Sequence, residues 1–172
     1  NKINMKKIVF ITLSLLLAVS FWNCEKDDIC ADGNANTPFV VIEFYDALNT
    51  TTLKNVTNLG VGEPTFDTRF SFTGISKIEV PLRTNSTTTT LNFIENGGDT
   101  TDTSDDNPDA ITFNYATSNV YISRACGYKT IFQLDPTTPI VLSPDSANWI
   151  QNIVVSQPNI ENENEVHVKI YF

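Results

Sequence analysis

The sequence predicts an all-β fold, an antiparallel β-sandwich with at most one short helical turn. From residue 39 onward, apolar side chains recur with period two, and Thr, Val, Ile, Phe and Tyr dominate these runs. Turn-forming residues divide the runs into short segments, and no long amphipathic helical pattern occurs among them. An immunoglobulin-like topology is one of the arrangements open to such a chain.

The composition agrees with a globular protein. The 172 residues are 41% hydrophobic and 18% charged, which excludes collagen-like, coiled-coil and wholly disordered chains. The 20 Asp and Glu residues outnumber the 11 Lys and Arg residues and give a formal net charge of −9. An acidic surface repels phosphate groups, so nucleic acid and anionic lipid are excluded as electrostatic partners.

Individual strands differ in their patterns. Residues 39–45 are apolar except for Glu43, which predicts a central strand covered on both faces. Alternating patterns predict half-exposed strands, with Pro81 at an edge or a bulge because it has no N–H to donate. These alternating segments are 69–73, 77–83, 110–117 and 166–172. Further strands are expected at 53–59, 88–94, 120–124, 128–134 and 150–156, and the one helical turn at 143–146.

Residues 1–23 have the pattern of a lipoprotein signal peptide. Lys6 and Lys7 precede an apolar run at 8–22, which is shorter than the ~20 residues that a membrane-spanning helix needs. The run ends just before Cys24, so we expect Cys24 to be the acylated first residue of the mature protein. The alternative is an ordinary cleaved signal in which Cys24 carries no lipid. We expect residues 24–38 to form a tether and residues 39–172 a single β-sandwich domain.

The residues after Cys24 predict where in the cell envelope the protein is anchored. Lys26, Asp27 and Asp28 follow it in a Cys-x-Lys-Asp-Asp pattern that resembles the acidic export tag of Bacteroidota lipoproteins. This resemblance implies anchoring in the outer membrane, at the cell surface rather than facing the periplasm. The alternative is a solvated charged leader. Removal of Lys2, Lys6 and Lys7 with the signal would change the net charge from −9 to −12.

Cys30 and Cys126 are expected to form a disulfide. If Cys24 carries lipid, these two cysteines remain in a compartment where disulfides persist. The alternatives are two unpaired buried cysteines, or a metal site, which a chain with one His and no Cys-x-x-Cys supports poorly. Cys30 lies six residues beyond Cys24 and hence within ~20 Å of it along the chain. The disulfide would therefore hold the folded body close to the membrane.

Three segments are candidate sites. The single histidine, His167, is expected to be exposed or at a sheet edge, and no Gly-x-Ser-x-Gly motif accompanies it as a catalytic partner. Arg124 and Lys129 flank Cys126 and could bind an anion, or pair with carboxylates of the protein itself. The acidic run at 95–109 offers oxygen ligands for calcium, although its spacing fits no EF-hand and such runs are mostly mobile loops. The aspartates considered for calcium are Asp99, Asp102, Asp105 and Asp106.

The chain resembles a family of small uncharacterised lipoproteins of Bacteroidota, from flavobacteria and their relatives. The likeness is carried by CEKDDIC at 24–30, KNVTNL at 54–59, VPLRT at 80–84, ITFNY at 111–115 and YISRACGYKTIF at 121–132, with segments 39–46 and 160–172. The resemblance implies a single-domain envelope lipoprotein and supplies no activity and no site residue beyond Cys24.

These observations together predict a non-enzymatic binding or envelope-assembly module with an unidentified envelope protein or glycan as its partner. No cofactor is expected unless the acidic run binds calcium. One alternative is a hydrolase of envelope glycans or peptides that uses scattered carboxylates. Another is a calcium-stabilised adhesion module.

Overall fold

The structure is a computed structural model that describes residues 5–20, 30 and 36–172. The chain divides into two compact units, one of residues 1–35 and 122–127 and one of residues 36–121 and 128–172. The only helix in the described residues, α1 (Met5–Ser20), belongs to the first unit and covers most of the apolar run of the predicted signal peptide. In the described part of the chain, no helix is both long and apolar enough to cross a membrane.

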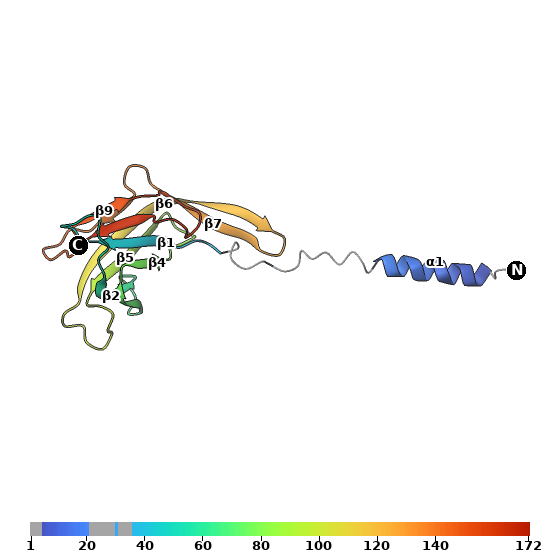
Figure 1. The fold of residues 1–172 in the computed structure, drawn as a ribbon, viewed down its shortest axis with the longest axis horizontal. Helices are drawn as coiled ribbons and strands as arrows, with labels where there is room; N and C mark the ends of the chain where they lie inside the picture. The colour runs from blue at the N-terminus through green and yellow to red at the C-terminus, as the bar shows by residue number, and fades with distance from the viewer. Residues whose placement is uncertain (1–4, 21–29, 31–35) are drawn as a thin grey trace. The chain divides into compact units, whose positions relative to one another are not determined.

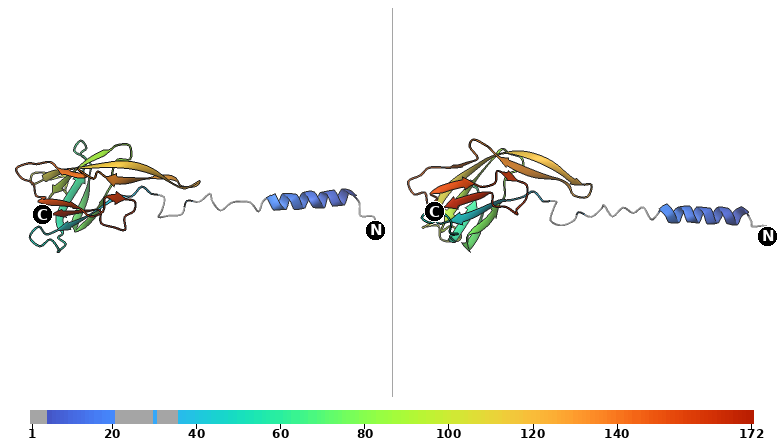
Figure 2. Two further views of the ribbon diagram at one scale, coloured as in Figure 1. Left: turned by 90° about the horizontal axis from the view of Figure 1, so that it is seen from above. Right: turned by 45° about the horizontal axis from the view of Figure 1, so that its top comes forward.

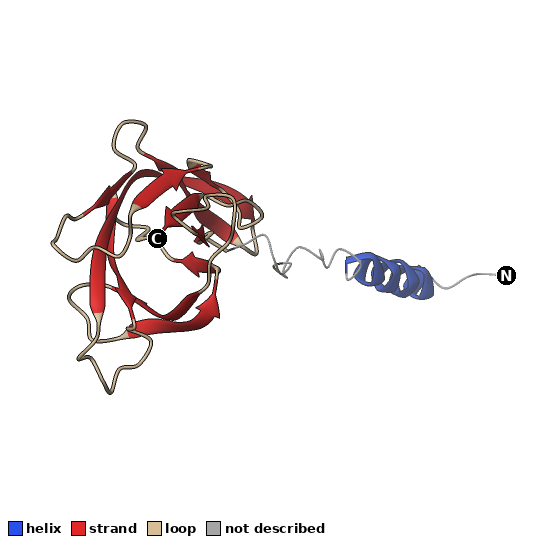
Figure 3. Cartoon of the chain, turned by 60° about the vertical axis from the view of Figure 1, so that its left-hand side comes forward, coloured by secondary structure: helices blue, strands red, loops and turns tan. Residues whose placement is uncertain are grey.

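Residues 36–172 contain strands and loops without a helix (Figure 3). The helical turn expected at 143–146 is instead a hydrogen-bonded turn. Asp145 Oδ1 accepts the Ala147 N–H at 2.6 Å, and Asn148 Oδ1 accepts the Asp145 N–H at 2.9 Å. Short polar side chains that bond to nearby backbone compete with helical hydrogen bonds, which explains why no helix forms there.

In the described residues, eleven strands form two sheets. Figure 1 labels several of these strands. The smaller sheet has the order β4 (Lys77–Val80), β1 (Val40–Tyr45), β11 (Val168–Tyr171), β9 (Asn152–Val155). The larger sheet has the order β10 (Asn159–Ile160), β7 (Gly127–Leu134), β6 (Asn107–Ser123), β5 (Thr88–Glu95), β2 (Val56–Gly62), β3 (Arg69–Ile75), and β8 (Ile140–Leu142) also pairs with β6. The predicted β-sandwich class is thus confirmed, and the larger sheet is antiparallel.

The smaller sheet is mixed, because β1 and β11 run parallel. Their register places Ile42 opposite Val168 and Phe44 opposite Ile170. β1 lies in the interior of this sheet, and Val41 is fully buried although it faces away from Val40 and Ile42. The predicted central strand covered on both faces is therefore confirmed at β1.

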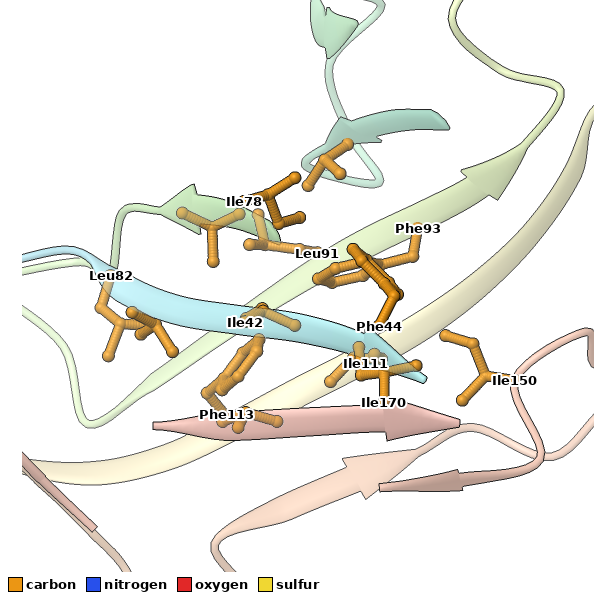
Figure 4. Close-up of a cluster of buried hydrophobic side chains, with 14 of the residues drawn as sticks. Ile42, Phe44, Ile78, Leu82, Leu91, Phe93, Ile111, Phe113, Ile150 and Ile170 are labelled. Carbon is orange, nitrogen blue, oxygen red and sulfur yellow. The ribbon is translucent and has the colours of Figure 1, made fainter. Parts of the chain in front are cut away.

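Inward-facing residues of both sheets form one apolar core (Figure 4). Ile42 and Phe44 of β1 pack in a cluster with Phe93 of β5 and with Ile111 and Phe113 of β6, and all five are fully buried. Alternate residues on β5 and β6 supply this face, as the period of two predicts. The core fixes the two sheets against each other in the second unit.

Some predicted boundaries are corrected. The strand expected at 77–83 ends at Val80, because Pro81 cannot donate to a ladder. The strands expected at 110–117 and 120–124 form one continuous strand, β6. Beyond Tyr115 both faces of β6 are exposed, and β6 and β7 continue together past the other strands as a hairpin arm (Figure 2). We call residues 116–121 and 128–130 of this hairpin the arm.

Candidate functional site

Cys30 and Cys126 form the predicted disulfide, with their Cα atoms 4.9 Å apart. Both residues belong to the first unit. Cys126 lies in the turn between β6 and β7, where its N–H donates to Ser123 Oγ at 3.0 Å. The predicted lipidation site and export tag lie outside the described residues: Cys24, Lys26, Asp27 and Asp28.

His167 is buried, which corrects the expectation of an exposed or edge histidine. Its side chain is 1% exposed, and its Nδ1 accepts the Val41 N–H at 2.9 Å. The His167 N–H in turn donates to the Val41 carbonyl at 3.0 Å. His167 thereby extends the parallel pairing of β1 and β11 by one position, and its ring serves as a backbone acceptor rather than a catalytic base.

The tautomer of His167 follows from this contact. Because the backbone N–H is a donor, Nδ1 must be unprotonated, and the ring proton of the neutral form lies on Nε2. Burial lowers the pKa of His167 from its usual value, whereas Glu165, Glu163 and a hydrogen bond to the Asn162 backbone act in the opposite direction. The neutral ring is therefore the form that the fold requires.

The aspartates considered for calcium bond mainly to their own loop. Asp99 Oδ1 accepts both the N–H and the Oγ1 hydroxyl of Thr101 at 2.8 Å, and Asp102 Oδ1 accepts the Ser104 N–H and hydroxyl. These bonds lower the pKa of Asp99 and of Asp102. Across residues 5–20, 30 and 36–172, no group of three or more His, Cys, Asp or Glu side chains could hold a metal ion, Asp105 and Asp106 included. The geometry gives the calcium hypothesis no support.

The two cations considered for anion binding have different surroundings. Lys129 Nζ donates to the Glu161 carbonyl at 3.0 Å, so its ammonium already has a backbone partner. Arg124 is exposed, and the two ion pairs formed among the described residues do not include it. Neither residue therefore forms the internal salt bridge that was the alternative, within that part of the chain.

Sequence reasoning missed an apolar groove beside β3. β3 is the last strand of the larger sheet, and the groove is lined by residues of β2, β3 and β5 together with the segments at 63–68 and 81–83. The groove has a volume of about 460 Å³. Phe66 and Phe70 are 62% and 59% exposed, which is unusual for large apolar rings. The residues that form its apolar lining are Gly62, Phe66, Phe70, Pro81, Leu82 and Leu91.

An ion pair forms the rim of this groove. Arg83 donates from Nε to Glu63 Oε1 at 2.9 Å and from Nη2 to Oε2 at 2.5 Å, a two-pronged contact. The guanidinium lowers the pKa of Glu63, and the carboxylate raises the pKa of Arg83. The Arg83 side chain remains 51% exposed, so a ligand in the groove could reach it.

The backbone beneath this rim is fixed to the core. Thr89 Oγ1 accepts the Arg83 N–H at 2.9 Å, and the Tyr115 hydroxyl donates to the Arg83 carbonyl at 2.8 Å. Thr89 and Tyr115 are buried and lie 2.6 Å apart at their oxygens. Burial raises the pKa of Tyr115, whereas its hydrogen bonds with Thr89 and the Arg83 backbone act to lower it. One wall of the groove is thus held in place by buried hydrogen bonds.

A second, polar hollow of about 340 Å³ lies on the other side of the loop at 63–68. Arg69 borders it and pairs with Asp106 at 2.6 Å, and Arg69 also donates to the Asp99 carbonyl. Arg69 Nε and Asp106 Oδ1 are buried and have no hydrogen-bond partner. The pair joins β3 to the acidic run at 95–109 through Asp106 Oδ2.

Comparison with known proteins gives a family. The family model described as a family of unknown function (DUF6452) matches residues 55–172, more than half of the chain. This range begins just before β2 and includes both the groove and the arm. Searches of curated proteins and of solved structures found no match. The chain therefore belongs to DUF6452, a family whose function is unknown.

Proposed function

We propose that this protein is a lipid-anchored lipoprotein of the outer membrane, displayed at the cell surface, whose sandwich binds an envelope protein without catalysing a reaction. The apolar groove beside β3 carries the proposal. Its volume of about 460 Å³ is in the range of ligand sites, and its polar groups converge at one rim, the Glu63–Arg83 pair. The bound element is an extended segment of the partner that places an apolar side chain in the groove.

The position of β3 supports an extended segment as the ligand. β3 is the last strand of the larger sheet, and within the described residues no strand pairs with its outer edge. Such an edge presents unpaired N–H and C=O groups that an incoming strand can pair with. Phe70 lies on this same strand and faces the groove. Main-chain pairing and side-chain burial would therefore act together.

The polar groups in the core favour binding over catalysis. His167 Nδ1 accepts a backbone N–H, and both carboxylate oxygens of Asp109 accept hydrogen bonds, from Asn148 Nδ2 at 2.9 Å and the Ile150 N–H at 2.8 Å. Both residues are buried, so neither presents a free base to a substrate. At the groove, Glu63 already bonds to Arg83.

The membrane location rests on the sequence. The apolar segment before Cys24, the following Lys26-Asp27-Asp28 and the resemblance to Bacteroidota lipoproteins support an acylated, outward-facing protein. Labelling cells with radioactive fatty acid should mark the wild-type protein and leave Cys24→Ser unlabelled. Cys24→Ser should also leave the membrane fraction. A Cys24→Ser variant that fractionates like the wild type would contradict the anchor.

Binding in the groove can be tested with a neutral apolar fluorophore, N-phenyl-1-naphthylamine. Phe66→Ser combined with Phe70→Ser should weaken its binding at least tenfold, because burial of even one Phe ring contributes about 1.5–3 kcal/mol. Leu48→Ser removes an apolar side chain that lies outside the groove and is 96% exposed, and it is the control. Equal affinities for the two variants would contradict a site in the groove.

The partner can then be captured in intact cells. A photocrosslinking residue at position 66 should form an adduct with one envelope protein, and the same residue at position 48 should not. The Phe70→Ser change should reduce the adduct at position 66. Adducts of equal yield from both positions would indicate random collisions and contradict the proposal.

A further inference from the structure

The arm carries two exposed tyrosines that pack against each other. Tyr121 of β6 and Tyr128 of β7 are 53% and 68% exposed, and their rings meet edge to face with centroids 5.3 Å apart. Such a cluster gains free energy when an apolar phase covers it, so its exposure calls for an explanation.

The chemistry of this cluster fits one environment in particular. A tyrosine ring combines an apolar body with a hydroxyl that requires water or a polar partner. Tyrosine is therefore enriched at the boundary between the headgroups and the hydrocarbon of a membrane. A wholly apolar partner would leave both hydroxyls unsatisfied, whereas the headgroup layer satisfies them.

The disulfide limits how far the arm can lie from the lipid anchor. Tyr128 follows Cys126 by two residues, and Cys126 is bonded to Cys30. Cys30 is six residues from Cys24, a contour of at most ~20 Å. The path from an acylated Cys24 to Tyr128 is thus short whatever course the intervening chain takes.

We propose that the Tyr121–Tyr128 pair docks into the headgroup layer of the membrane that holds the lipid anchor. The inference rests on the proposed acylation of Cys24. The tyrosines act as a second contact that orients the folded domain, because a lipid anchor at Cys24 alone leaves the domain free to rotate relative to the membrane. The test uses zwitterionic lipid, so the contact that it measures depends on the aromatic rings and not on attraction of the exposed Arg124 to anionic lipid.

The test uses the full acylated protein in vesicles of phosphatidylethanolamine and phosphatidylcholine. Tyr128→Trp places a fluorophore in the arm. As the control, Leu48→Trp places one in the loop that follows the C-terminal end of β1. The native Trp149 is buried and contributes the same background to both variants. Lipids brominated in the upper acyl chain quench only tryptophans that lie near them.

We expect quenching of at least twofold for Tyr128→Trp and none for Leu48→Trp. Raising the salt from 0.05 M to 0.5 M should leave the quenching unchanged, because the contact is not electrostatic. A Cys30→Ser, Cys126→Ser double variant should show weaker quenching at position 128, because the arm is no longer held near the anchor.

The outcomes separate this inference from the proposed anchor. Flotation of the protein with the vesicles, compared with that of Cys24→Ser, reports on the anchor. If the protein floats and Tyr128→Trp is not quenched, the docking of the arm is wrong and the anchor stands. If it fails to float, the anchor is wrong and the docking that depends on it is wrong too. Equal quenching at positions 48 and 128 would also overturn the docking.

Discussion

Polar side chains have opposite roles in the buried core and at the rim of the apolar groove. In the core, Asp109 joins β6 to the segment before β9, and His167 joins β1 to the start of β11. Asp109 Oδ2 and His167 Nδ1 each accept a hydrogen bond from a backbone N–H, and both residues are buried. At the rim, Glu63 and Arg83 satisfy each other in a position that solvent reaches.

This difference indicates where function can reside. A buried acceptor that bonds to the backbone cannot change partner without unfolding its surroundings, because an unpaired buried group costs free energy. An exposed ion pair can exchange one partner for a ligand at little cost, because water compensates. Polar residues of the core therefore serve stability, and those of the rim are available for binding.

The largest expected effect on stability comes from removing the buried hydrogen bonds that Asp109 accepts. Asp109→Ala should lower the free energy of unfolding by about 3 kcal/mol, because it leaves the Ile150 N–H and Asn148 Nδ2 without their acceptors. Asp109→Asn keeps one acceptor oxygen and should lose less. Urea denaturation of both variants and the wild type measures this, and equal stabilities for the Ala variant and the wild type would contradict the structural role.

The sequence predicted the strands of the core better than their pairing. The nearly continuous apolar run at residues 39–45 and the period of two at 110–117 both report burial directly, so β1 and the inner face of β6 were found. The parallel pairing of β1 with β11 joins strands more than 120 residues apart and is set by packing of the whole fold. No local pattern encodes such a long-range partner.

The errors at the candidate sites have a related cause. His167 precedes the first residue of β11, so alternation counted along the strand placed it on the exposed side. The groove was not predicted because Phe70 follows the same alternation as a core residue. Phe70 is nevertheless 59% exposed, and whether a residue at the last strand of a sheet is covered depends on long-range packing that local alternation does not encode.

A smaller effect is expected from protonation of His167. Its folded-state pKa is lowered, so the unfolded chain binds a proton more readily, and stability falls as the pH drops below about 6.5. One such group changes the free energy of unfolding by at most about 1.4 kcal/mol per pH unit. Denaturation between pH 7 and pH 5 measures this slope.

A matched variant assigns that slope to His167. His167→Asn retains an oxygen near the position of Nδ1 and does not titrate, so it should be less stable than the wild type at pH 7 but lack the slope below pH 6.5. Glu163 and Glu165 remain in the variant. If the variant keeps the full slope, those carboxylates and not the imidazole cause it.

The smallest expected change in stability is at the rim of the groove. Glu63→Gln removes the charge of the carboxylate but keeps an acceptor for Arg83. The two side chains are 25% and 51% exposed, so solvent reaches the pair and the midpoint of urea denaturation should not shift measurably. The same change should alter ligand binding, because the guanidinium then faces the groove without a counterion. Measuring the yield of the photocrosslinked adduct at position 66 in this variant distinguishes a role of the rim in ligand binding from a role in stability. A large loss of stability with unchanged adduct would mean that the rim, like the core, serves the fold alone.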